Sequence, residues 1–165
     1  MLQLAVTGYQ LSLFLHITAA VVGLGASFAE SITFQVAMKL DPRHLPYVHR
    51  LQTTINSRFV GPALAVVLVT GFYQVSKGNW DLGSFWLSAA LGIVVVIGAL
   101  SGAYFIPTDR RLERMVTDEI AAAGSGEVRL SESYQRMART EGLVGALTGL
   151  LIIVVIFLMV VKPGA

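Results

Sequence analysis

The chain has 165 residues, of which 55% are hydrophobic and 13% charged, and its formal net charge is +2. This composition is more apolar than that of an average soluble domain, and it excludes a nucleic-acid-binding module because no basic face alternates with exposed aromatic residues. The chain has no cysteine, which excludes disulfides, thiolate metal sites and iron–sulfur clusters.

Four stretches are long and apolar enough to cross a bilayer, whose hydrocarbon core of about 30 Å requires roughly 20 helical residues. They cover residues 10–36, 59–76, 85–106 and 142–161. The sequence therefore predicts an all-α polytopic membrane protein, a four-helix bundle that forms a single membrane domain over residues 1–165. No basic residue precedes Lys39, so we interpret the first stretch as a retained span and not as a secretory signal.

The first span carries a single histidine, His16, within the segment LFLHITAAVVGLG. At 100° per residue, small and polar side chains share the face of His16 along the whole span. Lipid offers no partner to polar groups, so this face is expected to point into the bundle. Ser12, Ser27 and Glu30 on this face form a possible polar path, and we expect Glu30 to make an ion pair with Arg58.

The segment 37–58 contains the other two histidines, His44 and His49, within DPRHLPYVHR. Their five-residue spacing differs from the four-residue spacing of a helical metal pair. We interpret both as polar residues of the membrane interface, and the remaining sequence yields no carboxylate pair, catalytic triad or phosphate-binding loop. The five methionines do not cluster as soft ligands would, so neither copper nor zinc is expected.

The second and third spans place glycines at the height of His16. Gly71 lies on the second span, and Gly92 and Trp86 lie on the third. Two glycines at one level would leave space for a flat cofactor, and an axial haem ligand requires a neutral imidazole in an apolar pocket. The prediction is a b-type haem bound by His16, Gly71, Gly92 and Trp86, with His16 as the metal ligand.

Three interpretations of His16 remain open. The first is the haem ligand, which gives the protein a redox or small-molecule-sensing role. The second is a purely structural residue whose imidazole hydrogen-bonds to Thr70 or Gln74, as in a non-enzymatic membrane subunit or scaffold. The third is a proton relay from His16 through Ser27 and Glu30, as in a small proton-coupled transporter.

Glycines four residues apart mark the third and fourth spans. Gly98 and Gly102 form one GxxxG pair, and Gly145 and Gly149 form another. Because such pairs let helix backbones approach closely in lipid, we expect the third and fourth spans to touch along them, or the pairs to hold a homodimer.

Basic residues concentrate in the segments 37–58 and 107–141. The positive-inside rule makes both segments cytoplasmic and both termini external, in a bacterial cytoplasmic membrane. Segment 107–141 keeps a helical spacing of apolar residues on both sides of a GSG break, with Ser131 as a candidate N-cap. We therefore expect the third and fourth spans to extend into the cytoplasm as a helical hairpin.

Three stretches together carry a family resemblance: LFLHITAAVVGLGASF, SRFVGPALAVVLVTGFY and WDLGSFWLSAALGIV. Over roughly residues 10–115 the chain resembles the uncharacterised bacterial "predicted integral membrane protein" family. That family is in turn similar to the membrane part of copper-resistance D proteins and, more distantly, to haem-associated membrane protoporphyrinogen oxidases. The resemblance implies a four-helix bundle in which His16 matches a haem-associated histidine and Arg58 an arginine at the start of the second span. The third span lacks the lysine that the oxidases carry there.

Overall fold

The computed structural model of the chain describes residues 7–164, and these residues form helices and short connections without any strand. In chain order the elements are α1 (Gly8–Ala37), η1 (Pro42–His44), α2 (Leu45–Ile55), η2 (Asn56–Val60), α3 (Gly61–Gly78), α4 (Phe85–Ala99), η3 (Leu100–Phe105), α5 (Ile106–Ala123) and α6 (Glu132–Val161). The two segments η2 and η3 are π-helical.

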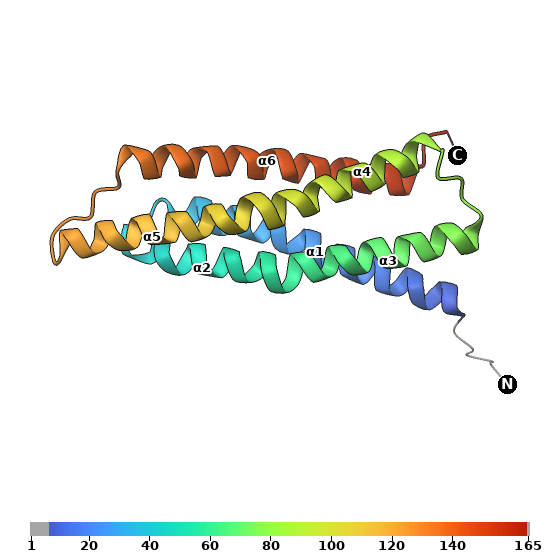
Figure 1. Cartoon of the computed structure of the whole chain (residues 1–165), viewed down its shortest axis with the longest axis horizontal. Coiled ribbons are helices and arrows are strands. Elements are labelled where there is room, and N and C mark those ends of the chain that lie inside the picture. Colours follow the sequence, from blue (N-terminus) through green and yellow to red (C-terminus); the bar gives the residue numbers. More distant parts are fainter. Residues whose placement is uncertain (1–6, 165) are drawn as a thin grey trace.

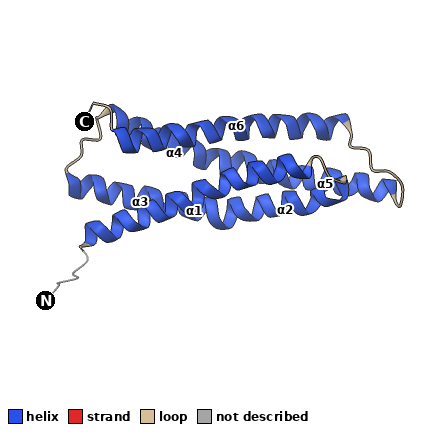
Figure 2. Cartoon of the chain, turned by 180° about the vertical axis from the view of Figure 1, so that it is seen from behind, coloured by secondary structure: helices blue, strands red, loops and turns tan. Residues whose placement is uncertain are grey.

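These elements join into four continuous rods, each long and apolar enough to cross a membrane. The rods are Gly8–Ala37, Pro42–Gly78, Phe85–Ala123 and Glu132–Val161. All four run along one axis, and the loops lie at the two ends of the bundle (Figures 1 and 2). The four-helix membrane bundle is confirmed.

The two ends of the bundle differ. α1 begins and α6 ends at one end, which we call the terminal end, while the loop between α5 and α6 lies at the opposite, hairpin end (Figure 1). The second and third rods have 37 and 39 residues, which corresponds to more than 50 Å at about 1.5 Å per residue. Because a hydrocarbon core spans only about 30 Å, α2 and α5 continue beyond it as helices.

Local sequence signals set the ends of this helical hairpin. α5 ends at Ala123, where Gly124 adopts a positive φ of 58° that favours glycine. The Ser131 side chain accepts a hydrogen bond from the Tyr134 backbone N–H at 3.2 Å, which starts α6. The predicted break at GSG and the predicted N-cap are both confirmed.

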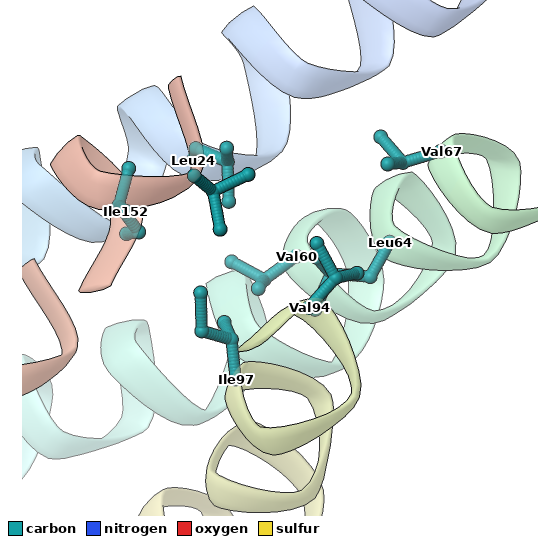
Figure 3. Packing of buried hydrophobic residues seen from close by; sticks show 8 residues of the cluster. Leu24, Val60, Leu64, Val67, Val94, Ile97 and Ile152 are labelled. Carbon is teal, nitrogen blue, oxygen red and sulfur yellow. The ribbon is translucent and has the colours of Figure 1, made fainter. Parts of the chain in front are cut away.

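The centre of the bundle is an apolar core to which all four rods contribute (Figure 3). Its buried members are Leu24, Val60, Leu64, Val67, Val94, Ile97, Ile152 and Val155. α1 packs closely against α3 at Gly23, where an added Cβ would lie 2.5 Å from the Ala63 Cβ. This packing fixes the register between the polar faces of the first two rods.

The glycine pairs do not mediate the contact that the sequence predicted for them. α4 does pack against α6, but an added Cβ at Gly98 would meet Leu64 of α3, and one at Gly149 would meet Phe28 of α1. Added Cβ atoms at Gly102 and Gly145 would meet nothing within 4 Å among the described residues. A homodimer through these glycines stays a prediction.

Candidate functional site

His16 lies toward the terminal end of the bundle, on the face of α1 that packs against α3. Its Nδ1 is 2.9 Å from the Thr70 hydroxyl oxygen, and the Thr70 hydroxyl itself donates to the Val66 carbonyl at 2.6 Å. His16 therefore donates from Nδ1, and Nε2 is left as the unprotonated ring nitrogen. Of the two predicted structural partners, Thr70 binds the imidazole, while the Gln74 amide donates to Ser12.

The residues predicted to bind a haem together with His16 differ in their surroundings. Gly71 accommodates the imidazole itself, since an added Cβ would lie 3.4 Å from His16 Cε1. Trp86 is buried and packs edge-on against Trp80 with ring centroids 5.5 Å apart. An added Cβ at Gly92 would have open space around it. Gly71 thus lies against the imidazole and Trp86 against Trp80, and haem binding by these residues stays a prediction.

The predicted polar path along α1 is divided into two parts. Ser12 and His16 bond to α3 near the terminal end, whereas the Ser27 hydroxyl donates to the Gly23 carbonyl of its own helix at 3.5 Å. Glu30 lies farther along, is buried, and accepts a hydrogen bond from Asn56 Nδ2 at 3.0 Å. The Arg58 side chain is exposed. The prediction of a Glu30–Arg58 ion pair was wrong. Within the described residues, Arg58 points away from the interior, where Glu30 lies.

A buried ionisable cluster toward the hairpin end is the main polar feature of the interior. His49 of α2 is fully buried, with Nδ1 2.9 Å from Asp109 Oδ1 of α5 and Nε2 2.8 Å from the Tyr134 hydroxyl of α6. Asp109 and Tyr134 are buried as well. The interpretation of His49 as an interfacial polar residue was therefore wrong, because α2 turns it into the space between α5 and α6.

Glu141 completes this cluster. It is only 5% exposed, and neither of its carboxylate oxygens has a hydrogen-bond partner among the described residues. One ligand atom each from His49, Asp109 and Glu141 lie within 4.8 Å of one another. A buried carboxylate without donors is costly unless a positive charge faces it. The arrangement is thus chemically suited to a cation.

The two π-helical segments meet beside this cluster. The Ser101 hydroxyl of η3 donates to Asn56 Oδ1 of η2 at 2.7 Å, and the Asn56 amide donates to Glu30. A π-helical turn inserts one extra residue and rotates the following side chains, and such turns frequently mark functional sites. Here they connect Glu30 of α1 to the second and third rods.

A cavity of about 660 Å³ borders the cluster, with Asp109 and Glu141 in its lining, and opens between α1 and α6. Its polar lining includes Glu30, Gln52, Asp109 and Glu141, and the Gln52 side-chain oxygen is also buried without a donor among the described residues. The apolar wall includes Phe28 and other exposed side chains of the first and fourth rods. The cavity therefore offers carboxylate and amide oxygens together with the basic side chains of Lys39 and Arg139, with room beside them for a further molecule.

Sequence reasoning missed this cluster because its members come from three separate helices. His49 and Asp109 are 60 positions apart and lie in segments that were interpreted as cytoplasmic connections. The available signal was weaker: a helical α2 places His49 on the same face as buried Leu45. That periodicity indicates burial, but it does not identify the partners.

Comparison with known proteins gives a family match over most of the chain. A family model described as "Predicted integral membrane protein (DUF2269)" matches residues 10–163, which include His16 and all members of the buried cluster. No curated protein and no solved structure matches the chain. The expected similarity to copper-resistance D proteins and protoporphyrinogen oxidases stays a prediction.

Proposed function

The chain belongs to the DUF2269 family of predicted integral membrane proteins, and we propose that it binds a divalent transition-metal ion at His49, Asp109 and Glu141. The observation that carries this proposal is the Glu141 carboxylate, which is buried without a partner beside two further ligand-type side chains. The ion supplies the positive charge that this carboxylate lacks.

The separation of the ligand atoms supports a coordination shell. His49 Nδ1 and Asp109 Oδ1 are 2.9 Å apart, and one ligand-type atom from each of His49, Asp109 and Glu141 lies within 4.8 Å of the others, so a single ion could contact all three after a small side-chain movement. Binding replaces the proton between Nδ1 and Oδ1 with the ion, so metal uptake releases that proton. Glu141 reaches the same ion by rotating a carboxylate that no hydrogen bond restrains among the described residues.

The donor set favours some metals over others. One imidazole nitrogen with two carboxylates is a mixed set of the kind that suits zinc, manganese or ferrous iron, whereas copper(I) prefers sulfur. This proposal departs from the expectation that zinc is not bound. Three protein ligands leave coordination positions open, and the cavity between α1 and α6 provides room for water or another ligand to fill them.

Tyr134 supports the site without binding the ion. His49 Nε2 lies 2.8 Å from the Tyr134 hydroxyl oxygen, so a His49 that held an ion through Nδ1 would donate its Nε2 proton to that oxygen. Such outer partners orient a metal-bound histidine, and their loss typically lowers metal affinity by about 10- to 100-fold. Tyr134 is therefore a positioning residue, and the Glu30–Asn56–Ser101 chain lines the remainder of the cavity.

Calorimetric titration of detergent-purified, chelator-treated protein with Zn²⁺ or Mn²⁺ tests the proposal. We expect one ion per chain, with a heat of binding that depends on the ionisation enthalpy of the buffer because a proton is released. His49→Ala, Asp109→Asn and Glu141→Gln should each abolish this site, and Tyr134→Phe should weaken it by about 10- to 100-fold.

His44→Ala is the matched control, because His44 is an exposed histidine five positions before His49. It should bind metal as the unsubstituted protein does, and circular dichroism should show that every variant remains helical. The assignment would be overturned if the His49→Ala and Glu141→Gln variants retained the ion, or if the His44→Ala variant lost it equally.

A second candidate function is haem binding through His16, with a redox or small-molecule-sensing role. Its support is the His16–Thr70 hydrogen bond, because donation from Nδ1 leaves Nε2 free to act as an axial ligand. When bound, a haem supplies electron-transfer or gas-binding chemistry. Because the His16 imidazole lies against Gly71 and Trp86 is buried, the macrocycle would lie against the exposed apolar flank of α1 or between two copies of the chain.

Visible absorption spectroscopy separates the two sites. Protein expressed with added haem should show a Soret band that sharpens with dithionite, that disappears in His16→Ala and that survives in His49→Ala. If no band forms, or if His16→Ala keeps it, His16 is a structural residue that links α1 to α3.

A further inference from the structure

A second polar cavity lies outside the metal cluster, between α5 and α6 at the edge of the apolar part of the bundle. Its volume is about 750 Å³, and its lining includes hydroxyl and guanidinium groups from both helices. The polar residues that matter here are Tyr104, Thr108, Arg111, Ser133, Arg136 and Thr140. None of them belongs to the proposed metal site.

The two arginines of this cavity are free to bind an anion. Arg111 and Arg136 are exposed, and within residues 7–164 neither makes an ion pair. Arg50 and Arg129, in contrast, pair with Glu113 and Glu127. Guanidinium groups bind phosphate through paired N–H donors. The Thr140 hydroxyl already donates to the Arg136 carbonyl and the Ser133 hydroxyl bonds to Ser131, so the hydroxyls that can add donors are those of Tyr104 and Thr108.

The depth of the cavity matches the headgroup layer of a bilayer. On the third rod the apolar sequence ends at Ile106, and on the fourth it resumes at Leu143. Arg111 lies five positions beyond the first boundary, which is about 8 Å along a helix. Tyr104 lies just inside that boundary, where amphipathic aromatic rings are enriched at membrane interfaces.

We propose that this cavity binds the headgroup of an anionic phospholipid, with the phosphate between Arg111 and Arg136. Basic pockets between membrane helices at the headgroup level recognise such lipids. Glu132 also lines the cavity and accepts a hydrogen bond from a headgroup hydroxyl, which favours a glycerol headgroup over one that carries only phosphate. The lipid would clamp α5 to α6 where the two rods leave the membrane.

Native mass spectrometry of delipidated protein tests this site with phosphatidylglycerol and phosphatidylcholine as probes. We expect preferential retention of phosphatidylglycerol, reduced about fivefold by Arg111→Gln or Arg136→Gln and roughly 25-fold by the double variant, as two basic contacts of typical strength would give. Arg129→Gln is the matched control, because its guanidinium is exposed and paired within the loop between α5 and α6.

Inorganic phosphate and glycerol phosphate, added as competitors, distinguish a lipid site from a site for soluble phosphate. Neither should displace phosphatidylglycerol at millimolar concentration, because the acyl chains stay in the apolar phase. Equal retention of the two lipids, unchanged retention by the double variant, or displacement by soluble phosphate would overturn the proposal. The arginine variants should leave zinc binding unchanged, so this result and that of the metal titration are independent.

Discussion

A buried carboxylate raises the energy of a folded chain unless a donor or a positive charge faces it. Among residues 7–164, Glu141 has no hydrogen-bond donor and no ion pair, whereas Asp109 lies 2.9 Å from His49 Nδ1. At the scale of single residues, burial therefore disfavours the charged form of Glu141, and a cation bound beside it would stabilise that form.

Replacing Glu141 should have opposite effects on stability in the metal-free and the zinc-bound protein. Glu141→Met should stabilise the metal-free protein by about 1–3 kcal/mol, because it replaces an unpaired buried polar group with an apolar one of similar volume. The same variant should lose the stabilisation that zinc gives the unsubstituted protein. Thermal unfolding in detergent, with chelator and then with zinc, measures both effects.

Glu127→Met is the control for this prediction, since Glu127 is an exposed acid in the loop between α5 and α6 and its surface pair with Arg129 contributes little to stability. It should change stability by no more than about 0.5 kcal/mol in either condition. Destabilisation of the metal-free protein by Glu141→Met would mean that the carboxylate has a partner without the ion, and would contradict the account of the cluster.

At the scale of elements, the contact between α1 and α3 positions both polar sites. Gly23 brings the two backbones together, which places His16 beside Thr70 on one side of the contact and Glu30 beside Asn56 on the other. Any side chain at position 23 has to push these helices apart.

Gly23→Ala should therefore destabilise the bundle by about 1–3 kcal/mol, the usual cost of overpacking a close contact. Unfolding in a denaturing detergent series measures it. Gly25→Ala, two positions away with open space around an added Cβ, should be neutral or slightly stabilising because alanine favours the helix. Adding Ala63→Gly to Gly23→Ala should restore stability, and failure of this rescue would show that another contact sets the approach.

At the scale of the whole molecule, the hairpin half of the bundle carries most of the basic residues, whereas Lys77 and Lys162 lie at the terminal end. The positive-inside rule predicts that the hairpin end is cytoplasmic and the terminal end external. Because the chain has no cysteine, single cysteines report the orientation directly. Ser125→Cys, in the loop between α5 and α6, should react with an impermeant maleimide only after the cells are opened.

Leu82→Cys, on the loop between α3 and α4 and half exposed, should react in intact cells. The reverse labelling pattern would show that the bundle is inserted in the opposite direction. It would also place the lipid cavity in the outer leaflet.

Hydropathy and capping signals predict much of this architecture. The site is harder to predict because it depends on how the helices pack against one another, which local signals do not determine. The four spans follow from composition, and Ser131 follows from local capping chemistry. The buried face of α1 follows from periodicity, since Ser12, Gly23 and Glu30 are all buried. Which residue faces Glu30 depends instead on helix rotation and on the π-helical turn at Asn56, so Arg58 was the wrong partner.

The most direct test of the central claim is an anomalous difference map at the zinc edge, from crystals of protein loaded with one equivalent of zinc. The account predicts a peak within coordination distance of His49 Nδ1, Asp109 and Glu141, with the Tyr134 hydroxyl against Nε2. A map with zinc only at exposed residues such as His44, or with no peak in the cluster, would contradict it.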